Sequence, residues 1–323
     1  MNGDMLPAVI DPAGKWDGMP PLVTQAGGNA RFAWDELFSA HIRNPHTRRA
    51  YSHAVRQFLA WCEAHTLELR QITPCSVGTY YDQLHASIPT KKQHLSALKC
   101  FFDRLVIRHA LGLNPAASVR GERYQLAEGK TPEITVEQER RLLASIHVHD
   151  IVGLRDRAIA AVLIYTAARI GAVAGLRVGS YAHDGSQRVL RFLEKGGKAR
   201  DIPVRDDLER FLSAYLEAAE LRSAPDNEPL FRRLARKSGV LKPQAMTADD
   251  MGRMLKQRMA DIGLPTQLSP HSFRVATITD LLSQGVPLEE VQHLVGHADP
   301  RTTRLYDRRQ KKVMRSVVDR ISV

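Results

Sequence analysis

The sequence has 323 residues, which predicts about two domains at roughly 150 residues each. Hydrophobic residues make up 43% of it, and no apolar run approaches the roughly 20 residues that a membrane-spanning helix needs. The start of the chain lacks the cationic and apolar segments of a secretory signal. The three cysteines match no metal or redox spacing, and an odd count argues against a disulfide framework, so we expect a reducing, cytoplasmic setting.

The charge balance indicates a polyanionic partner. The net charge is +11, and residues 300–323 hold eight basic residues against two acidic ones, so the excess is concentrated near the C-terminus. Such an excess is typical of nucleic-acid binders, because neutralising phosphates releases condensed counterions. The alternative that charge alone leaves open is a basic protein without such a partner.

The first part of the chain is predicted to be helical. Residues 1–30 are rich in Gly, Pro and Asn without any period, and we expect a flexible tail there. Apolar residues then recur three and four apart over residues 47–64 and 90–109, which predicts two amphipathic helices. Asn44 is the expected cap of the first, and a further helix is expected to begin at Thr73.

These patterns predict a mainly α protein with two domains. A helical domain is expected over residues 31–118, a charged linker over 119–131, and a second domain over 132–323. The second domain is predicted to be mixed α/β with a small antiparallel sheet, because two extended runs flank a two-glycine turn within residues 188–204. Thr135 is expected to begin its first helix with a capping box.

An anion-binding helix start is predicted at residues 269–274. Ser269 is a good N-cap, and His271 and Arg274 lie three apart on the first turn of the helix that follows. There they stand beside free backbone N–H groups and the positive end of the helix dipole, which favours an anion. The pair alone is a weak signal, since a His followed by a basic residue at this spacing is expected about twice by chance.

The next elements add to that site. Gly296 is expected to end a helix, and His297 follows at its exit. Asp299 is expected to begin a new helix over residues 301–309, which carries Tyr306 in a strongly basic setting.

Two residues keep alternative interpretations. His293 and His297 are four apart, but Gly296 breaks the helix between them and no third ligand is evident, so no metal site is predicted and His293 is interpreted as a surface or packing residue. Arg169 ends an apolar helix over residues 155–168. It either interacts with the C-terminal dipole of that helix or enters a cleft as a cation.

Together these motifs resemble the tyrosine recombinase (phage integrase) family. The residues that carry the resemblance stand in the family's order: Arg169, Lys195, His271, Arg274, Gly296-His297 and Tyr306. The segment 294–306 is the most recognisable part, and His297 and Tyr306 are nine positions apart, as in that family. The resemblance covers about residues 31–323 and implies a SAM-like core-binding domain followed by an integrase-like catalytic core.

The resemblance also implies roles for six catalytic residues. The groups that stabilise the phosphate are matched by Arg169, Arg274 and His297. His271 matches the His of the His-x-x-Arg pair and is a candidate base. Lys195 matches the mobile lysine that protonates the leaving oxygen, and Tyr306 matches the nucleophile. The chain departs from the family pattern in two places. Ala172 stands where the family commonly has an acidic residue, and Ala167 stands where it usually has glycine.

The implied activity is site-specific DNA recombination through a covalent 3′-phosphotyrosine. The implied partner is double-stranded DNA with paired inverted-repeat sites, bound by a tetramer. No metal, nucleotide cofactor, small-molecule substrate or membrane is implied. The expected location is the cytoplasm, and the nucleoid when the protein is bound to DNA. Two alternatives remain: a type IB topoisomerase-like enzyme, and a catalytically impaired architectural or regulatory DNA-binding protein. Formation of a covalent adduct on nicked DNA distinguishes the enzymes from the impaired protein.

Two basic segments have more than one interpretation. Lys91, Lys92, Arg48 and Arg49 are candidate phosphate contacts, and a solvated helix face explains each equally well. Residues 308–323 combine basic residues with an apolar stripe at helical spacing, which either folds back on its own domain or docks on a neighbouring protomer.

Overall fold

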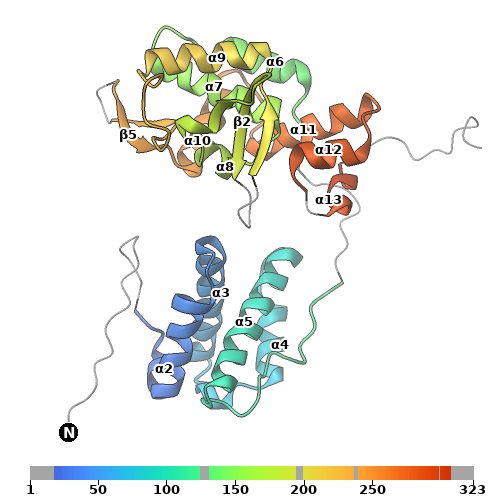
Figure 1. Ribbon diagram of the computed structural model, residues 1–323. Coiled ribbons are helices and arrows are strands. Elements are labelled where there is room, and N and C mark those ends of the chain that lie inside the picture. Colours follow the sequence, from blue (N-terminus) through green and yellow to red (C-terminus); the bar gives the residue numbers. More distant parts are fainter. Residues whose placement is uncertain (1–17, 124–130, 194–198, 236–238, 298, 307–323) are drawn as a thin grey trace, which may run out of the picture. The chain divides into compact units, whose positions relative to one another are not determined.

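A computed structural model describes residues 18–123, 131–193, 199–235, 239–297 and 299–306. The chain divides into two compact units, Met1–Gln125 and Leu126–Val323, and each has a hydrophobic core of its own (Figure 1). Among the described residues, every helix is too short or too polar to cross a membrane.

The first unit is a helical bundle whose predicted caps are confirmed. The side chain of Asn44 accepts hydrogen bonds from the backbone N–H groups of His46 and Thr47, and Thr73 caps its helix through Ser76. The helical segments of this unit, in chain order, are α1 (Pro21–Gln25), α2 (Gly28–Asp35), the π-helical turn η1 (Glu36–His41), α3 (Pro45–Ala64), the 3-10 turn η2 (Leu69–Gln71), α4 (Pro74–Gln83) and α5 (Ile88–Ile107).

Aromatic side chains from α3, α4 and α5 meet in the core of this bundle. Phe58 packs edge-on against Tyr80 and Phe102, with ring centroids 5.0 and 6.0 Å apart. The hydroxyl of Tyr80 in turn lies 3.1 Å from Nδ1 of the buried His94. Edge-to-face pairs each add roughly 0.5–1.5 kcal/mol beyond the area they bury, so these contacts hold α3 against α4 and α5.

The expectation of a flexible tail over residues 1–30 is wrong for residues 18–30. Leu22 and Val23 of α1 are buried against the bundle. The backbone N–H of Leu22 donates to Glu63 of α3, and Arg56 donates to the carbonyl of Gly18 at 2.8 Å. The composition of residues 18–30 did not indicate that they dock on the bundle. Two buried apolar residues and two hydrogen bonds are enough to hold the segment there, and they leave little trace in its composition. Residues 1–17 lie outside the described residues.

The second unit combines helices with two small antiparallel sheets. Its elements are α6 (Val136–Ser145), α7 (Ile151–Thr166), α8 (Ile170–Ala174), the 3-10 turn η3 (Val178–Ser180), β1 (Tyr181–His183), β2 (Arg188–Leu193), β3 (Ala199–Pro203), α9 (Asp206–Ala218), β4 (Arg232–Leu234), β5 (Leu241–Ala245), α10 (Ala248–Asp261), α11 (Pro270–Ser283), α12 (Leu288–Val295) and α13 (Pro300–Arg304). The sheets have the strand orders β1-β2-β3 and β4-β5.

The predicted hairpin is confirmed as β2 and β3, paired from Val189↔Pro203 to Leu193↔Ala199. The sequence analysis missed β1 and the β4-β5 hairpin. The reason is physical: β1 has only three residues, and β5 (Leu-Lys-Pro-Gln-Ala) has neither an apolar alternation nor a favourable strand interior, since it contains Pro243.

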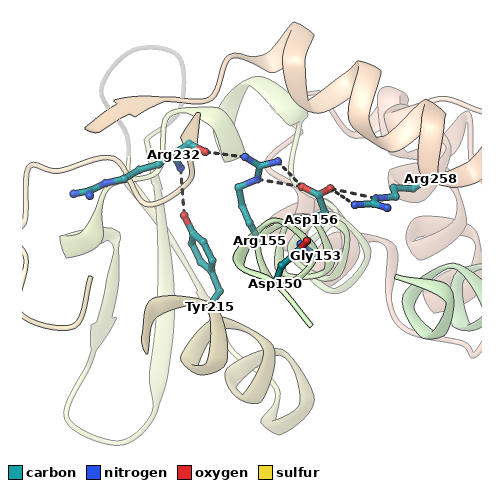
Figure 2. Close-up of polar contacts among 7 residues, drawn as sticks. All are labelled: Asp150, Gly153, Arg155, Asp156, Tyr215, Arg232 and Arg258. Atoms are coloured by element: carbon teal, nitrogen blue, oxygen red, sulfur yellow. Dashed lines mark hydrogen bonds and ion pairs between the residues drawn. The ribbon is translucent and has the colours of Figure 1, made fainter. Parts of the chain in front are cut away.

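Helix α7 is the centre of the second unit. It is buried on nearly all sides and contacts α6, α8, α9, α10 and α11, as expected for a helix that is apolar all round. Two of its charged residues are also buried, and Figure 2 shows why they are tolerated. Asp156 accepts from Arg155 beside it at 2.7 Å and from Arg258 of α10 at 2.8 Å, while Arg155 donates to the carbonyl of Arg232 in β4. This network joins α7 to α10 and to the β4-β5 hairpin.

Replacing Asp156 by Asn removes the one carboxylate that both guanidinium groups share. Because a buried charge without its partner is costly, we expect Asp156→Asn to lower the free energy of unfolding by about 3 kcal/mol or more. Denaturant unfolding of the purified protein measures this. Asp201→Asn, which breaks a solvent-exposed pair with Arg191, is the matched control and should cost less than about 1 kcal/mol. Equal losses in the two variants would contradict the assignment.

A second buried acid, Glu139 of α6, lacks a comparable network. The residue is 7% exposed, and within the described part of the chain its Oε1 atom has no hydrogen-bond partner. Burial raises the pKa of this carboxyl to about 8, and the nearby Asp280 and Glu133 carboxylates add to the effect. Glu139 therefore keeps its proton in the folded protein at neutral pH.

This raised pKa predicts a loss of stability with rising pH. Between the ordinary pKa of 4.5 and the folded value of about 8, the folded chain holds a proton that the unfolded chain releases, so stability falls as pH rises through that window. We expect Glu139→Gln to stabilise the protein at pH 7 by about 2 kcal/mol or more and to flatten the decline. Thermal unfolding from pH 5 to 9 measures both effects. The exposed Glu137→Gln on the same helix should leave the profile unchanged.

Candidate active site

Arg274 on the first turns of α11 is the most buried charged residue near the predicted site, with 1% of its surface exposed. Its Nη1 donates to the backbone carbonyl of Ala167, and its Nη2 donates to the carbonyl of Val295 at 2.7 Å. These carbonyls belong to the C-terminal ends of α7 and α12, where the helix dipoles favour a cation. The guanidinium thus joins three helices and is held in one place. Figure 1 shows α11, α12 and α13 grouped at one end of the unit.

The end of α7 is shaped by Ala167, which lies in the left-handed region with a φ of 48°. This turn directs the carbonyl of Ala167 toward Arg274. A non-glycine residue costs roughly 1 kcal/mol in this conformation. The methyl group of Ala167 is fully buried in a small core with Val275, Val295 and Tyr306, which offsets part of that cost. The glycine-to-alanine departure is therefore accommodated by packing.

Arg169 follows the same turn. It is the N-cap of the short helix α8 and is exposed to solvent. Its positive charge lowers the pKa of both His271 and His297. This electrostatic effect agrees with the interpretation of Arg169 as a cation of the site. Ala172, three residues later on α8, is partly buried and packs against the main core of the unit.

His271 and Tyr306 face one another. Nε2 of His271 lies 3.1 Å from the hydroxyl oxygen of Tyr306, although the two residues are 35 positions apart. Partial burial lowers the pKa of His271, and the Arg274 and Arg169 charges lower it further. The ring is therefore neutral at pH 7, and a neutral imidazole at this distance can accept the proton of the tyrosine hydroxyl.

The ring of His297 also lies against the ring of Tyr306. The two rings are nearly parallel, with centroids 5.9 Å apart, and His297 is 7% exposed. Burial lowers the pKa of His297 to about 4, with further lowering by Arg274, Arg169, His271 and Arg200. Its Nδ1 lies 2.9 Å from the hydroxyl of the buried Thr303. If Thr303 donates this bond, Nε2 carries the ring proton and is the nitrogen that can donate to a phosphate.

Tyr306 itself departs from the predicted position on a helix. Helix α13 ends at Arg304, and Tyr306 follows in a turn in which its backbone N–H donates to the carbonyl of Thr303 at 3.0 Å. The expectation of a helix over residues 301–309 is wrong for Leu305 and Tyr306, and the rest of that range lies outside the described residues. The residue is 8% exposed, so its ring is part of the protein core while its hydroxyl reaches His271.

The structure thus brings together five of the six predicted site residues: Arg169, His271, Arg274, His297 and Tyr306. Lys195, which falls between β2 and β3 in the sequence, lies outside the described residues. His293 is on the exposed side of α12. Within the described ranges, no group of three or more His, Cys, Asp or Glu side chains could hold a metal ion.

The sequence analysis missed two kinds of contributor. The first is the pair of carbonyls, from Ala167 and Val295, that hold Arg274, because backbone groups leave no mark in a residue pattern. The second is Thr303, whose sequence neighbour Thr302 offered the same chemistry. Only the buried side of α13 distinguishes the two threonines, since Thr303 is fully buried.

Comparison with known proteins identifies the family. Residues 132–312 match the model of the phage integrase family, and residues 33–109 match the phage integrase N-terminal SAM-like domain. The chain therefore belongs to the phage integrase family and is a tyrosine recombinase, with the mainly helical fold that its sequence predicts.

The relatives and solved structures agree with this assignment. The chain is 29% identical to tyrosine recombinase XerD of Shewanella oneidensis, over 84% of this chain and 89% of that protein. It is also 29% identical to tyrosine recombinase XerC of Myxococcus xanthus, over 88% and 95%. The fold is similar to that of XerH site-specific recombinase bound to a palindromic difH substrate, with a TM-score of 0.69 at 17% identity over 90% and 88% of the two chains.

Thr303→Val tests whether the buried hydroxyl orients His297. Valine keeps the shape and removes the hydrogen bond, so His297 loses the group that selects its tautomer. We expect DNA cleavage to slow by about 10-fold, with DNA affinity unchanged and some loss of stability. Single-turnover cleavage and gel-shift titration measure the two functions. Thr303→Ser retains the hydroxyl and should cleave at nearly the original rate; a Ser variant as slow as the Val variant would argue against this role.

Proposed function

We propose that this protein is a site-specific recombinase that cuts and rejoins duplex DNA through a covalent 3′-phosphotyrosine at Tyr306. Membership of the phage integrase family supports this, and the 3.1 Å separation of His271 Nε2 and the Tyr306 hydroxyl carries it. A tyrosine hydroxyl is a weak nucleophile at its ordinary pKa of about 10, and an adjacent base corrects that weakness.

The proposed cleavage step balances in atoms and charge. The Tyr306 oxygen attacks the phosphorus and gives its proton to His271, while the bond from phosphorus to the 5′-oxygen breaks. The leaving oxygen takes a proton from Lys195, which the resemblance to the family assigns to this role. Rejoining is the same step in reverse with a new 5′-hydroxyl. The phosphotyrosine conserves the bond energy, so the cycle requires no nucleotide cofactor.

The cations of the site suit the transition state. A phosphodiester under attack carries extra negative charge on its two non-bridging oxygens. Arg274 is held by two carbonyls and Arg169 stands at the start of α8, so two guanidinium groups are available to bind those oxygens. His297 supplies a neutral donor. These side chains provide the charge stabilisation that a metal ion provides in other phosphoryl-transfer enzymes.

The proposed partner is double-stranded DNA with paired inverted-repeat sites, held by a tetramer. The solved structure of lambda integrase as a dimer on a COC′ core site supports association on DNA. The basic, apolar segment 308–323 is the proposed link between protomers; it lies outside the described residues. We place the protein in the cytoplasm and, when bound to DNA, on the nucleoid.

The proposal is tested by sequencing the DNA beside the gene for an inverted repeat and assaying a nicked duplex that carries it. The short 5′-hydroxyl fragment diffuses away after cleavage and leaves the protein attached to DNA, which denaturing gels detect as a slower band. We expect an adduct with the unaltered protein and none with Tyr306→Phe, because phenylalanine has no attacking oxygen.

Gel-shift titration gives the control, since Tyr306→Phe should bind the same DNA with unchanged affinity. DNA binding without any adduct by the unaltered protein would instead support the impaired, architectural alternative. An adduct that persists in Tyr306→Phe would mean that another residue is the nucleophile.

A further inference from the structure

A side-chain amide on the last turn of α12 binds the backbone of His297. Nε2 of Gln292 donates to the carbonyl oxygen of His297 at 2.9 Å, and the backbone N–H of His297 donates to the carbonyl of Gln292 at 3.2 Å. Both polar groups of the His297 main chain are therefore bound by one residue. Because only the NH₂ group of an amide can donate to a carbonyl, this contact also fixes the orientation of the Gln292 side chain.

The way in which α12 ends explains why a side chain is used here. Gly296 lies in the left-handed region with a φ of 64°, and its N–H donates to the carbonyl of His293 at 3.2 Å. This turn takes His297 out of the helix, so its carbonyl accepts from the Gln292 side chain and not from a further helical turn. His297 is almost completely buried, where an unpaired carbonyl is unfavourable.

The residue on the other side of Gly296 is held as well. The carbonyl of Val295 accepts from Nη2 of Arg274 at 2.7 Å. The turn is thus bound before Gly296 by Arg274 and after it by Gln292, and these side chains come from two different helices.

The hydrogen bonds continue from His297 to the proposed nucleophile. Nδ1 of His297 lies 2.9 Å from the hydroxyl of Thr303, and the carbonyl of Thr303 accepts from the backbone N–H of Tyr306 at 3.0 Å. The rings of His297 and Tyr306 are also nearly parallel, with centroids 5.9 Å apart. The turn that carries Tyr306 is therefore connected through His297 to Gln292.

We propose that Gln292 is a positioning residue for the cleavage step. Its amide fixes the backbone of His297 and thereby the placement of the His297 ring beside Tyr306. The proposal rests on the function proposed above, in which His297 donates to the phosphate and Tyr306 attacks it. Gln292 acts through His297, and a small displacement of a catalytic group is enough to slow a reaction strongly.

Gln292→Met tests this role, because methionine has a similar length and lacks the amide donor. We expect adduct formation on the nicked duplex to slow by about 10-fold, with DNA affinity unchanged, since the reacting groups remain but are placed less well. Gln284→Met is the matched control. Gln284 is the exposed C-cap of α11, and its amide donates to Asp280 at 2.7 Å. Its loss should change the rate by less than about twofold, as for most surface substitutions.

Two results would overturn the proposal. One is an equal rate for Gln292→Met and Gln284→Met. The other is a loss of DNA affinity that matches the loss of rate, because the amide would then support the fold in general; a variant that folds poorly gives this result. If the unaltered protein forms no adduct, the proposed function itself fails. If it forms one and Gln292→Met matches it, only the role of Gln292 fails.

A His297→Ala background shows whether Gln292 acts through the histidine. Two substitutions that affect the same group are not additive, so adding Gln292→Met to His297→Ala should slow adduct formation by less than about twofold more. A general structural role of the amide does not depend on the His297 ring. A further loss of about 10-fold in this background would therefore overturn the proposal.

Discussion

The guanidinium of Arg274 is the interaction on which the rest of the site depends. It sits almost completely out of water and is held by the final carbonyls of two helices, α7 and α12. A buried cation needs such partners, because desolvation otherwise costs several kcal/mol. Because its guanidinium donates to both carbonyls, Arg274 holds the end of α7, the start of α11 and the end of α12 close together. The residues that follow those ends are Arg169 and His297, and the Arg169 and Arg274 charges both act on the ring of His297.

Helix α7 connects the Arg274 site to the other elements of the second unit. Its far end is tied to α10 and β4 through Asp156 and Arg155, and its near end turns at Ala167 to present a carbonyl. A residue in the left-handed region stores about 1 kcal/mol of strain, which persists only where the surroundings determine the conformation. Here the buried methyl of Ala167 and the bond from Arg274 determine it. The position of Arg274 in the site thus depends on the end of the central helix α7.

The cations of the site also set the protonation of its histidines. Burial and the Arg274 and Arg169 charges lower the pKa of His271 and His297, so both rings are neutral where an ordinary histidine is partly charged. The neutral histidine rings and the charged arginines therefore have different roles. In the proposed mechanism, His271 accepts a proton from Tyr306, His297 donates one hydrogen bond, and the guanidinium groups carry the positive charge that the phosphate requires.

Much of this organisation was predictable, because local rules govern helix starts. Asn44, Thr73, Thr135 and Ser269 cap the helices that the sequence indicated, and the two-glycine turn marked the β2-β3 hairpin. The polar β4-β5 hairpin was missed, since it lacks an apolar alternation. The docked segment at residues 18–30 was missed because its attachment depends on Glu63 and Arg56, far along the chain.

The sequence by itself determined which chemistry is available: two arginines, a lysine, two histidines and a tyrosine in a fixed order, with His271 and Arg274 on one helical turn. Only the tertiary structure decided how those groups meet. The Arg274–Ala167 bond spans 107 positions and the His271–Tyr306 contact spans 35, and no local rule specifies such pairs. The choice of Thr303 over Thr302 likewise follows from burial. It depends on tertiary packing, whose energy is defined only once the chain has folded.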